Sequence, residues 1–283
     1  MTDSSATSKG TLYIVATPIG NRDDISARAI ETLKNVDIIL AEDTRHSGQL
    51  LQVLGIKNTL SSMHTHNESE KSQEILHSLQ QGKSFALISD AGTPLISDPG
   101  FPLVRLAQEH AIPVIPIPGA CAFITALCAA GVPCETFTFC GFLPAKTTAR
   151  QEKLKSLNST YHTLIFYEST HRILDCIDDI GLIFGQDCEL VLAKELTKTF
   201  ERIMRSSCTQ IKEWLLADKA HCKGEFVLII PAREAPESQA EEYLAILRIL
   251  LAEVSLKQAV KITAQITGGN KNELYKIALE MNK

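Results

Sequence analysis

The sequence contains no C-x-x-C pair, although it has eight cysteines among its 283 residues. Structural zinc sites need closely spaced ligands, and disulfide frameworks are typical of small secreted chains. The scattered cysteines therefore predict reduced thiols that mostly pack as small core residues. His64 and His66 fall on one face of a predicted strand, but no neighbouring cysteine or carboxylate completes a set of ligands. We expect no metal site.

An excess of positive charge is also missing, because the formal net charge is -5 and the isoelectric point is near 5.9. This balance excludes binding to nucleic acid through overall charge, so any such binding needs a local cationic patch.

No apolar run in the sequence has the character of a membrane span or a leader. The charge-free stretch 111–134 is long enough to span a membrane, but four prolines interrupt it. The first ten residues are polar and lack an apolar segment. The expectation is a cytoplasmic protein without membrane attachment.

Strands and helices alternate regularly in the first half of the chain, which predicts a parallel α/β sheet. The length and the 45% apolar content suit about two domains with substantial cores. Short apolar segments predict strands over 12–17, 37–41, 59–63, 84–89 and 113–117. Amphipathic segments between them predict helices over 26–35, 44–54, 69–81 and 101–110.

The second half predicts a mixed sheet, because only some of its strands are joined by helices. Its expected strands cover 136–142, 163–169, 188–197, 200–207 and 225–231, after a helix over 120–130. Beyond Pro231 and Pro236 come helices over 238–253 and 256–266, a Gly-Gly-Asn turn, and a last helix. The predicted organisation is a polar tail (1–10), an N-terminal α/β domain (11–120), a C-terminal α/β domain (121–232) and a helical extension (233–283).

Three loops at strand ends carry the strongest signal for a ligand site. They are 16–21, 89–100 and 116–123, each containing Pro and Gly directly after a predicted strand. Ligands of open α/β sheets bind at the carboxyl ends of the strands, so the three loops predict one small-molecule site. The sequence lacks both G-x-G-x-x-G and a Walker A motif, which disfavours dinucleotide binding and NTP hydrolysis.

These loops also carry a family resemblance. LYIVATPIGNRDDIS, AEDTR, SDAGTPLISDPG and PIPGACAFITAL occur in the order found in the tetrapyrrole methylase-like superfamily. GFLP, YESTHRI, KELTKTFE and KGEFVLII extend the match, which runs from about residue 11 to the C-terminus. The chain most closely resembles the branch that methylates small-subunit ribosomal RNA. Its first loop, ATPIGN, differs from the glycine-rich loop of tetrapyrrole-acting relatives, which argues against a porphyrinoid substrate.

The resemblance implies a homodimeric enzyme that binds S-adenosylmethionine (SAM) in a cleft between the two α/β domains. It also implies 2′-O-methylation of a cytidine ribose in the decoding region of 16S rRNA, as free RNA or in the 30S subunit. Two alternatives remain open: a SAM-dependent methylase of a small tetrapyrrole or a protein side chain, and a non-catalytic RNA-binding protein. The cofactor contacts implied by the resemblance are Ile19, Gly20, Asp90, Gly92, Thr93, Pro94, Ile96, Ser97, Pro118, Gly119, Cys121, Ala122, Tyr167, Leu196 and Glu225.

Several charged groups at strand ends are candidates for activating the acceptor hydroxyl, since a base raises the rate of such a transfer. They are Glu42 and Asp43 with Arg45, Glu168 with His171 and Arg172, and Glu195 with Lys194. Each group has an alternative interpretation as an ion pair that holds a loop. Asp43 and Arg45 are expected to act on RNA, across the sheet from loop 89–100.

RNA contacts are expected where lysines and arginines cluster. Residues 254–283 hold five Lys and two Glu, a local charge of +3, and the helical extension resembles a helix-turn-helix. The alternative is a helical appendage that packs on the body or on a partner subunit. The candidate RNA-binding residues are Arg45, His46, Lys146, Arg150, Arg172, Lys261, Lys271 and Lys276.

Overall fold

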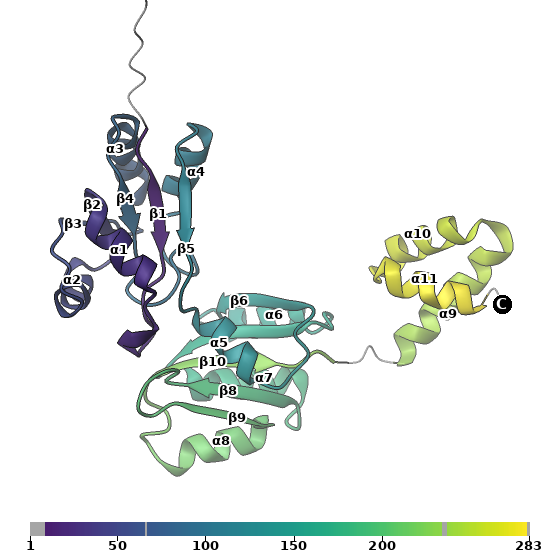
Figure 1. Cartoon of the computed structure of the whole chain (residues 1–283). Coiled ribbons are helices and arrows are strands. Elements are labelled where there is room, and N and C mark those ends of the chain that lie inside the picture. The colour runs from purple at the N-terminus through teal and green to yellow at the C-terminus, as the bar shows by residue number, and fades with distance from the viewer. Residues whose placement is uncertain (1–8, 66, 234–236, 282–283) are drawn as a thin grey trace, which may run out of the picture. The chain divides into compact units, whose positions relative to one another are not determined.

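The computed structural model describes residues 9–65, 67–233 and 237–281 (Figure 1). By their contacts the residues form two compact units, one ending at Ala232 and the other beginning at Arg233. His66, Pro236 and most of the predicted polar tail lie outside the described residues.

The first sheet is fully parallel, as predicted, with the strand order β3-β2-β4-β1-β5. Its helices bury both faces under two apolar clusters, so its inner strands are hydrophobic throughout. Its strands are β1 (Leu12–Val15), β2 (Ile38–Ala41), β3 (Leu60–Ser62), β4 (Phe85–Leu87) and β5 (Val114–Ile117). The segments between them form the short helix η1 (Arg22–Asp24) and the α-helices α1 (Ala27–Asn35), α2 (Thr44–Val53), α3 (Glu68–Gln80) and α4 (Phe101–Glu109).

Local capping explains where two of these helices begin. The Ser26 hydroxyl accepts a hydrogen bond from the Ala29 amide at the start of α1. The Asp43 carboxylate accepts one from the Arg45 amide at the start of α2. Each cap gives a hydrogen-bond partner to an amide in the first turn, which has none within the helix. The caps therefore define the residue at which the preceding loop ends and the helix begins.

The second sheet is mixed, which confirms the two-sheet α/β prediction. Its order is β6-β7-β10-β8-β9, and only β6 and β7 are parallel. An apolar cluster under α6, α7 and α8 covers one face, and a cluster that includes α5 residues covers the other. The strands are β6 (Phe137–Phe142), β7 (Thr163–Ser169), β8 (Glu189–Lys194), β9 (Arg202–Ser207) and β10 (Glu225–Ile230). The helices are α5 (Ala122–Ala129), α6 (Thr147–Leu157), α7 (Ile173–Phe184) and α8 (Cys208–Ala217).

Arg150 is buried rather than exposed, so its predicted place in a surface cluster that contacts RNA is wrong. Only 2% of its side chain is accessible, and its Nε donates to Asp179 Oδ2 at 2.5 Å. Arg150 lies on α6 and Asp179 on α7, so the ion pair joins two neighbouring helices of the second sheet. Lys146, at the start of α6, remains exposed.

None of the eight cysteines, all of which are described, is part of a disulfide. Cys176 and Cys208 are buried as predicted for core residues, whereas Cys128 and Cys134 are exposed. Within the described residues there is no cluster of His, Cys, Asp and Glu suited to a metal. Nor does any helix in the described part of the chain have both the length and the apolar character to cross a membrane.

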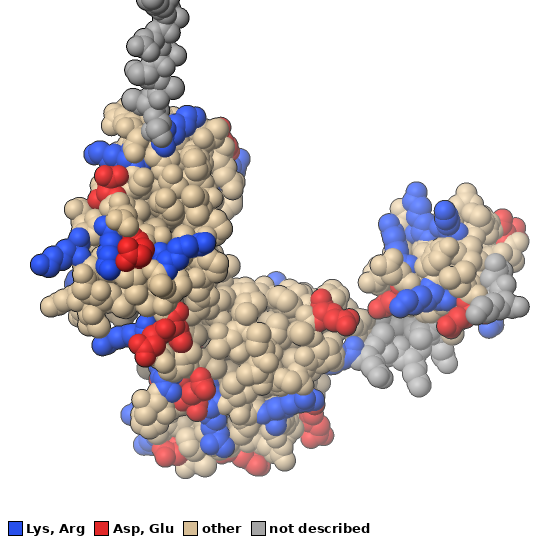
Figure 2. Space-filling view, viewed as in Figure 1, with Lys and Arg blue, Asp and Glu red and all other residues tan. Residues whose placement is uncertain are grey.

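The second unit consists of α9 (Glu237–Glu253), α10 (Leu256–Thr267) and α11 (Lys271–Met281) around a small core of its own. The Ser255 amide donates to Gln258 Oε1 at the start of α10, and Gly268 ends that helix with φ +70°. The predicted turn between the last two helices is thereby confirmed. Lys261, Lys271 and Lys276 are exposed. Figure 2 shows basic side chains gathered on part of this unit's visible surface.

Candidate active site

A cavity of about 560 Å³ opens where the first sheet meets the second. Its walls come from the loop after β1, the carboxyl ends of β2, β4, β6, β7 and β8, the start of α5 and the start of β10. The arrows of β1 and β5 in Figure 1 point toward the second sheet, so the predicted loops meet at this edge. Its size lies within the range of small-molecule sites.

The loop after β4 forms much of the cavity wall and has an unusual backbone. The Thr17 amide donates to the Gly92 carbonyl at 2.8 Å, and the Gly92 amide donates back at 3.1 Å. Gly92 has φ +85°, while Leu95 and Ser97 adopt φ values near +70° although they carry side chains. Such conformations cost about 1–3 kcal/mol each in non-glycine residues and gather at functional sites. The loop is therefore tied to the chain just after β1 by a pair of backbone hydrogen bonds.

The structure brings most of the predicted cofactor residues around this one cavity, and four of them lie elsewhere. Gly20 lines a neighbouring cavity, Pro94 is buried, and Pro118 and Gly119 are exposed outside the lining. The residues that line the cavity are Ile19, Asp90, Gly92, Thr93, Ile96, Ser97, Cys121, Ala122, Tyr167, Leu196 and Glu225.

Three carboxyl groups that line the cavity, those of Glu42, Asp90 and Asp98, are close enough to affect one another's pKa values. Burial and the nearby Glu42 and Asp90 charges together raise the pKa of Asp98 to about 6, against a hydrogen bond with Ser89 that lowers it. Burial and Asp90 likewise raise the pKa of Glu42. Glu42 is one of the predicted candidate bases, whereas no sequence pattern indicates Asp98. Its motif Asp-Pro-Gly marks a turn, and nothing local reveals the carboxylates that surround it.

Asp43 and Arg45 lie outside the cavity lining, and the predicted placement across the sheet from loop 89–100 is wrong. Strand β2 pairs directly with β4, and the Asp43 amide donates to Asp90 Oδ1 at 3.2 Å. Hydrogen bonds from the Arg45 side chain and backbone hold the pKa of Asp43 well below its usual range. A carboxylate with so little proton affinity is a poor base.

Glu168, which lines the cavity, forms an ion pair with Arg172 at the end of β7. Arg172 Nη2 lies 2.7 Å from Glu168 Oε1, and the Glu168 side chain has no exposed surface. Glu168 and His171 both line the cavity. The Arg172 side chain is about three-quarters buried, so it is placed to hold the turn after β7 rather than as a surface contact for RNA.

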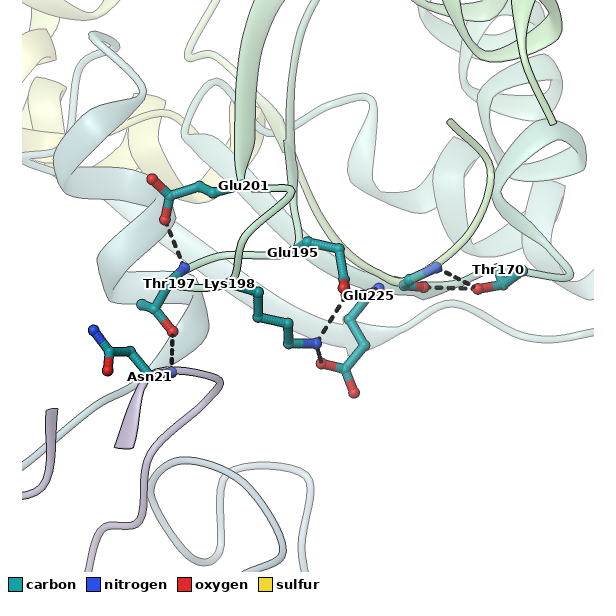
Figure 3. A network of polar contacts seen from close by, with 8 residues as sticks. Asn21, Thr170, Glu195, Thr197, Lys198, Glu201 and Glu225 are labelled. Carbon is teal, nitrogen blue, oxygen red and sulfur yellow. Dashed lines mark hydrogen bonds and ion pairs between the residues drawn. The ribbon is translucent and has the colours of Figure 1, made fainter. Parts of the chain in front are cut away.

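Glu195 belongs to a polar network at the rim rather than to the lining. Lys198 Nζ bridges Glu195 Oε1 at 2.8 Å and Glu225 Oε2 at 2.9 Å (Figure 3). Burial disfavours the charged form of Glu195, but hydrogen bonds from Lys198 and the Glu225 amide outweigh it and lower its pKa. The Thr170 hydroxyl also bonds to both backbone polar groups of Gly224, which fixes the start of β10 (Figure 3).

The residues of the cavity fit SAM, the cofactor implied by the family resemblance. A Cβ added at Gly92 would lie 3.2 Å from Ile19 Cγ2, so a side chain there would press on a residue of the cavity wall. Glu42 and Asp90 suit a cationic sulfonium, and the first amides of α5 suit a carboxylate. Ile96, Ala122 and Leu196 provide an apolar wall for an adenine.

The chain matches two known protein families. A family described as Tetrapyrrole (Corrin/Porphyrin) Methylases matches residues 11–212, and one described as RsmI C-terminal HTH domain matches residues 237–282. Among solved structures, a diphthine synthase superposes with a TM-score of 0.61 at 14% identity, covering 82% of this chain and 94% of that one. The methyltransferase CobJ gives 0.58 at 15% identity, covering 80% and 97%. At these identities the likeness shows the shared fold alone.

Curated relatives are similar along almost the whole chain. Ribosomal RNA small subunit methyltransferase I of Haemophilus influenzae is 50% identical over 273 residues, covering 95% of this chain and 96% of the relative. The protein of the same name from Pseudomonas aeruginosa is 49% identical over 276 residues, covering 96% and 98%. The chain therefore belongs to the tetrapyrrole methylase family, and within it to the group of ribosomal RNA small subunit methyltransferase I proteins.

Proposed function

We propose that the chain transfers a methyl group from SAM to the ribose 2′-hydroxyl of a cytidine in the decoding region of 16S rRNA. The relatives' name supports small-subunit rRNA as the substrate, and the cavity supports a cationic methyl donor. With ribosomal RNA as substrate, the proposed activity takes place in the cytoplasm.

The single observation that carries the chemistry is the carboxyl group of Asp98 in the cavity. Its pKa of about 6 is close to working pH, so it is mostly ionised there and still has proton affinity. A general base works best when its pKa lies near the operating pH. Among the acidic residues that line the cavity, Asp98 combines this position with a pKa close to neutrality. We therefore assign Asp98 as the group that accepts the proton of the acceptor hydroxyl.

The remaining residues bind and orient the reactants. When bound, SAM supplies an electrophilic methyl on a sulfonium, whose positive charge disappears during transfer. Glu42 and Asp90 keep the pKa of Asp98 raised and add negative potential around the donor. Loop 89–100 and the start of α5 enclose the donor. Such positioning lowers the barrier to methyl transfer, because it fixes the direction in which the acceptor hydroxyl meets the methyl group and excludes water.

A homodimer is part of the same proposal, supported by an apolar surface on the second sheet. Ile124 and Cys128 lie one turn apart on α5 and are exposed. Phe137, on the edge strand β6, is 39% exposed and lies near Phe123 of α5, with 6.2 Å between the ring centroids. Exposed apolar side chains gathered on a helix and an edge strand are typical of a subunit interface, and a second copy of this chain is the proposed partner.

The test is methyl transfer from labelled SAM to 30S subunits isolated from a strain that lacks this chain. We expect incorporation at one cytidine, located by nucleotide-resolution mapping of ribose methylation. Free 16S rRNA, a tetrapyrrole precursor and a bulk protein fraction are the comparison substrates. Incorporation into one of the last two instead of RNA would contradict the proposed function. Binding of RNA without any transfer would favour the non-catalytic alternative.

A further inference from the structure

A second cavity of about 330 Å³ adjoins the first one. The two share Ile19, Asp90, Ala91 and Glu225 as a common wall. The other side of the second cavity is formed by the loop after β1 and by α2. Those residues are Pro18, Gly20, Arg22, His46, Gln49, Leu50 and Val53, with Lys198 at the rim.

The two cavities differ in charge. The acidic and basic side chains that line the first cavity are all carboxyl groups except His171. The second cavity has Arg22, His46 and Lys198 in its lining, beside the shared Asp90 and Glu225. Lys198 is already held by Glu195 and Glu225 (Figure 3). Arg22 is exposed and forms no ion pair with any residue in the described ranges. Its guanidinium is free to bind a phosphate.

The second cavity also has an apolar part that suits a sugar or a base. Leu50 and Val53 lie on the side of α2 that lines it, and Val53 is 54% exposed. Gln49, one turn before Val53, adds an amide on the same side. Cationic and apolar groups side by side are what single-stranded RNA requires, since its phosphates are charged and its bases are unstacked.

We propose that the second cavity holds the RNA strand on the 3′ side of the methyl acceptor. Arg22 and His46 bind the phosphodiester, and Leu50 and Val53 contact the next sugar or base. This rests on the proposed function. A ribose 2′-hydroxyl and its 3′-phosphodiester are attached to neighbouring carbons of one sugar. An acceptor whose hydroxyl reaches Asp98 therefore has that phosphate nearby, and the acidic first cavity repels it. The cavity beyond the shared wall is the adjacent place that attracts it.

The test uses opposite charge changes at one exposed position. In Gln49→Lys the Michaelis constant for 30S subunits falls, and in Gln49→Glu it rises, each on the order of 5-fold as for one surface charge interaction. Both residues are compatible with a helix, so α2 is expected to stay folded. Arg22→Gln raises the Michaelis constant on the order of 10-fold, since it removes one charge-assisted hydrogen bond. A plot of the logarithm of 30S affinity against the logarithm of salt concentration should also be shallower for Arg22→Gln. Its slope falls by about 0.7 for each phosphate that the variant no longer binds.

The matched controls are Gln108→Lys and Gln108→Glu. Gln108 is exposed near the end of α4, just before β5 begins, at the opposite edge of the sheet from both cavities. Its variants leave the Michaelis constant unchanged, and all variants keep the parent's SAM affinity by calorimetry. Gln49 and Arg22 variants that match the controls overturn this proposal. Loss of SAM affinity in them also overturns it, because the cavity then serves the cofactor. Failure of the parent chain to methylate any 30S subunit is a different result, and it removes the proposed function together with this extension.

Discussion

The backbone amide of Asn21 donates a hydrogen bond of 2.9 Å to the hydroxyl of Thr197, 176 positions further along the chain (Figure 3). The bond joins the loop after β1 to the loop between β8 and β9, so it links the two sheets at the cavity rim. The Thr197 amide donates in turn to Glu201 Oε2, at 2.6 Å, and Thr197 adopts φ +65°. The cavity wall formed by Ile19 and Leu196 thus depends on a close approach of two loops.

Gly20 permits that approach, and its replacement by Ala should weaken SAM binding. An added Cβ would lie 2.5 Å from Lys198 Cγ, 2.7 Å from Thr197 Oγ1 and 3.0 Å from the Leu196 carbonyl oxygen. Relief of this overlap separates the loops, at a cost of about 1–3 kcal/mol. Compared with the parent chain, Gly20→Ala should have a lower midpoint of thermal unfolding. Its dissociation constant for SAM, measured by calorimetry, should be larger.

The matched control for this substitution is Gly48→Ala. Gly48 lies inside α2, where an added Cβ meets Leu60 Cδ1 at an ordinary 3.6 Å. Alanine inside a helix stabilises by about 0.5–1 kcal/mol relative to glycine, so this variant should bind SAM normally and unfold at a slightly higher temperature. Equal SAM affinity in the two variants would show that the loop contact does not shape the cofactor site.

Asp98→Asn should abolish most methyl transfer and leave SAM binding intact. Loss of a general base lowers the rate about 10²- to 10⁴-fold. In the parent chain, single-turnover transfer to 30S subunits should rise with pH through about 6 and then level off, because the ionised carboxyl is the active form. Asp187→Asn, a change at an exposed position outside both cavities, is the control. A normal rate in Asp98→Asn would exclude the assigned role.

Asp98→Asn should also stabilise the folded protein at neutral pH, by an amount that depends on pH. Folding raises the pKa of Asp98 from 3.8 to about 6, so the folded state binds the proton more tightly than the unfolded state does. The folded state therefore loses stability as pH rises from about 4 to 6, and the loss persists above that range. Asp98→Asn should accordingly unfold at a higher temperature than the parent at pH 7.5. That difference should shrink as pH is lowered toward 4, and a constant difference would contradict a buried titrating carboxyl.

The Arg150–Asp179 pair should contribute to stability and not to RNA binding. Removal of one partner leaves a buried charge alone, so Arg150→Ala is expected to lower the free energy of unfolding by about 3–5 kcal/mol. Arg105→Ala breaks an exposed pair with Glu109, whose side chains are 67% and 49% accessible, and should cost about 0–1 kcal/mol. Urea unfolding compares the two variants. A loss of 30S affinity in folded Arg150→Ala, with unchanged unfolding, would restore the surface interpretation.

The sequence predicted the elements of both sheets well, because each inner strand is an apolar run bounded by turn residues. It did not predict the order of strands in space. For this reason the sequence placed Asp43 across the sheet from loop 89–100, which contains Asp90. In the structure β2 and β4 are neighbours, although β3 lies between them in the chain. Strand order depends on how crossover helices pack, which local patterns do not encode.

Individual site residues were harder to predict than the site itself. The family motifs and strand-end loops indicated the cavity, but the role of Asp98 depends on Glu42, which lies on a different strand end. Arg150 was misassigned because a cationic helix segment is usually solvated, and its partner Asp179 belongs to another helix. In both cases the decisive neighbour is distant in sequence, so no local pattern contains it.

The lysines of the helical unit are predicted to add phosphate contacts for the RNA substrate. The triple change of Lys261, Lys271 and Lys276 to Gln removes three exposed charges, and glutamine preserves α10 and α11. The affinity for 30S subunits should fall, with a log–log salt slope shallower by about 0.7–0.9 for each phosphate that is no longer neutralised. The control changes Lys57, Lys83 and Lys219, which are exposed on the first unit, to Gln. Filter binding across a salt series measures both variants.

A chain that ends at Ala232 tests the helical unit as a whole. The unit has its own apolar core around Leu247, Val260 and Leu274, and the chain divides into its two units at Arg233. The shortened chain should therefore fold, bind SAM like the parent and lose 30S affinity at least as strongly as the triple lysine variant. Methylation should fall through the Michaelis constant for 30S subunits, with a nearly unchanged turnover rate, because the cavity lies entirely in the first unit. If truncation instead leaves 30S affinity and its salt slope unchanged but converts a dimer to a monomer in light scattering, the helices serve assembly. The lysines then have no part in holding RNA.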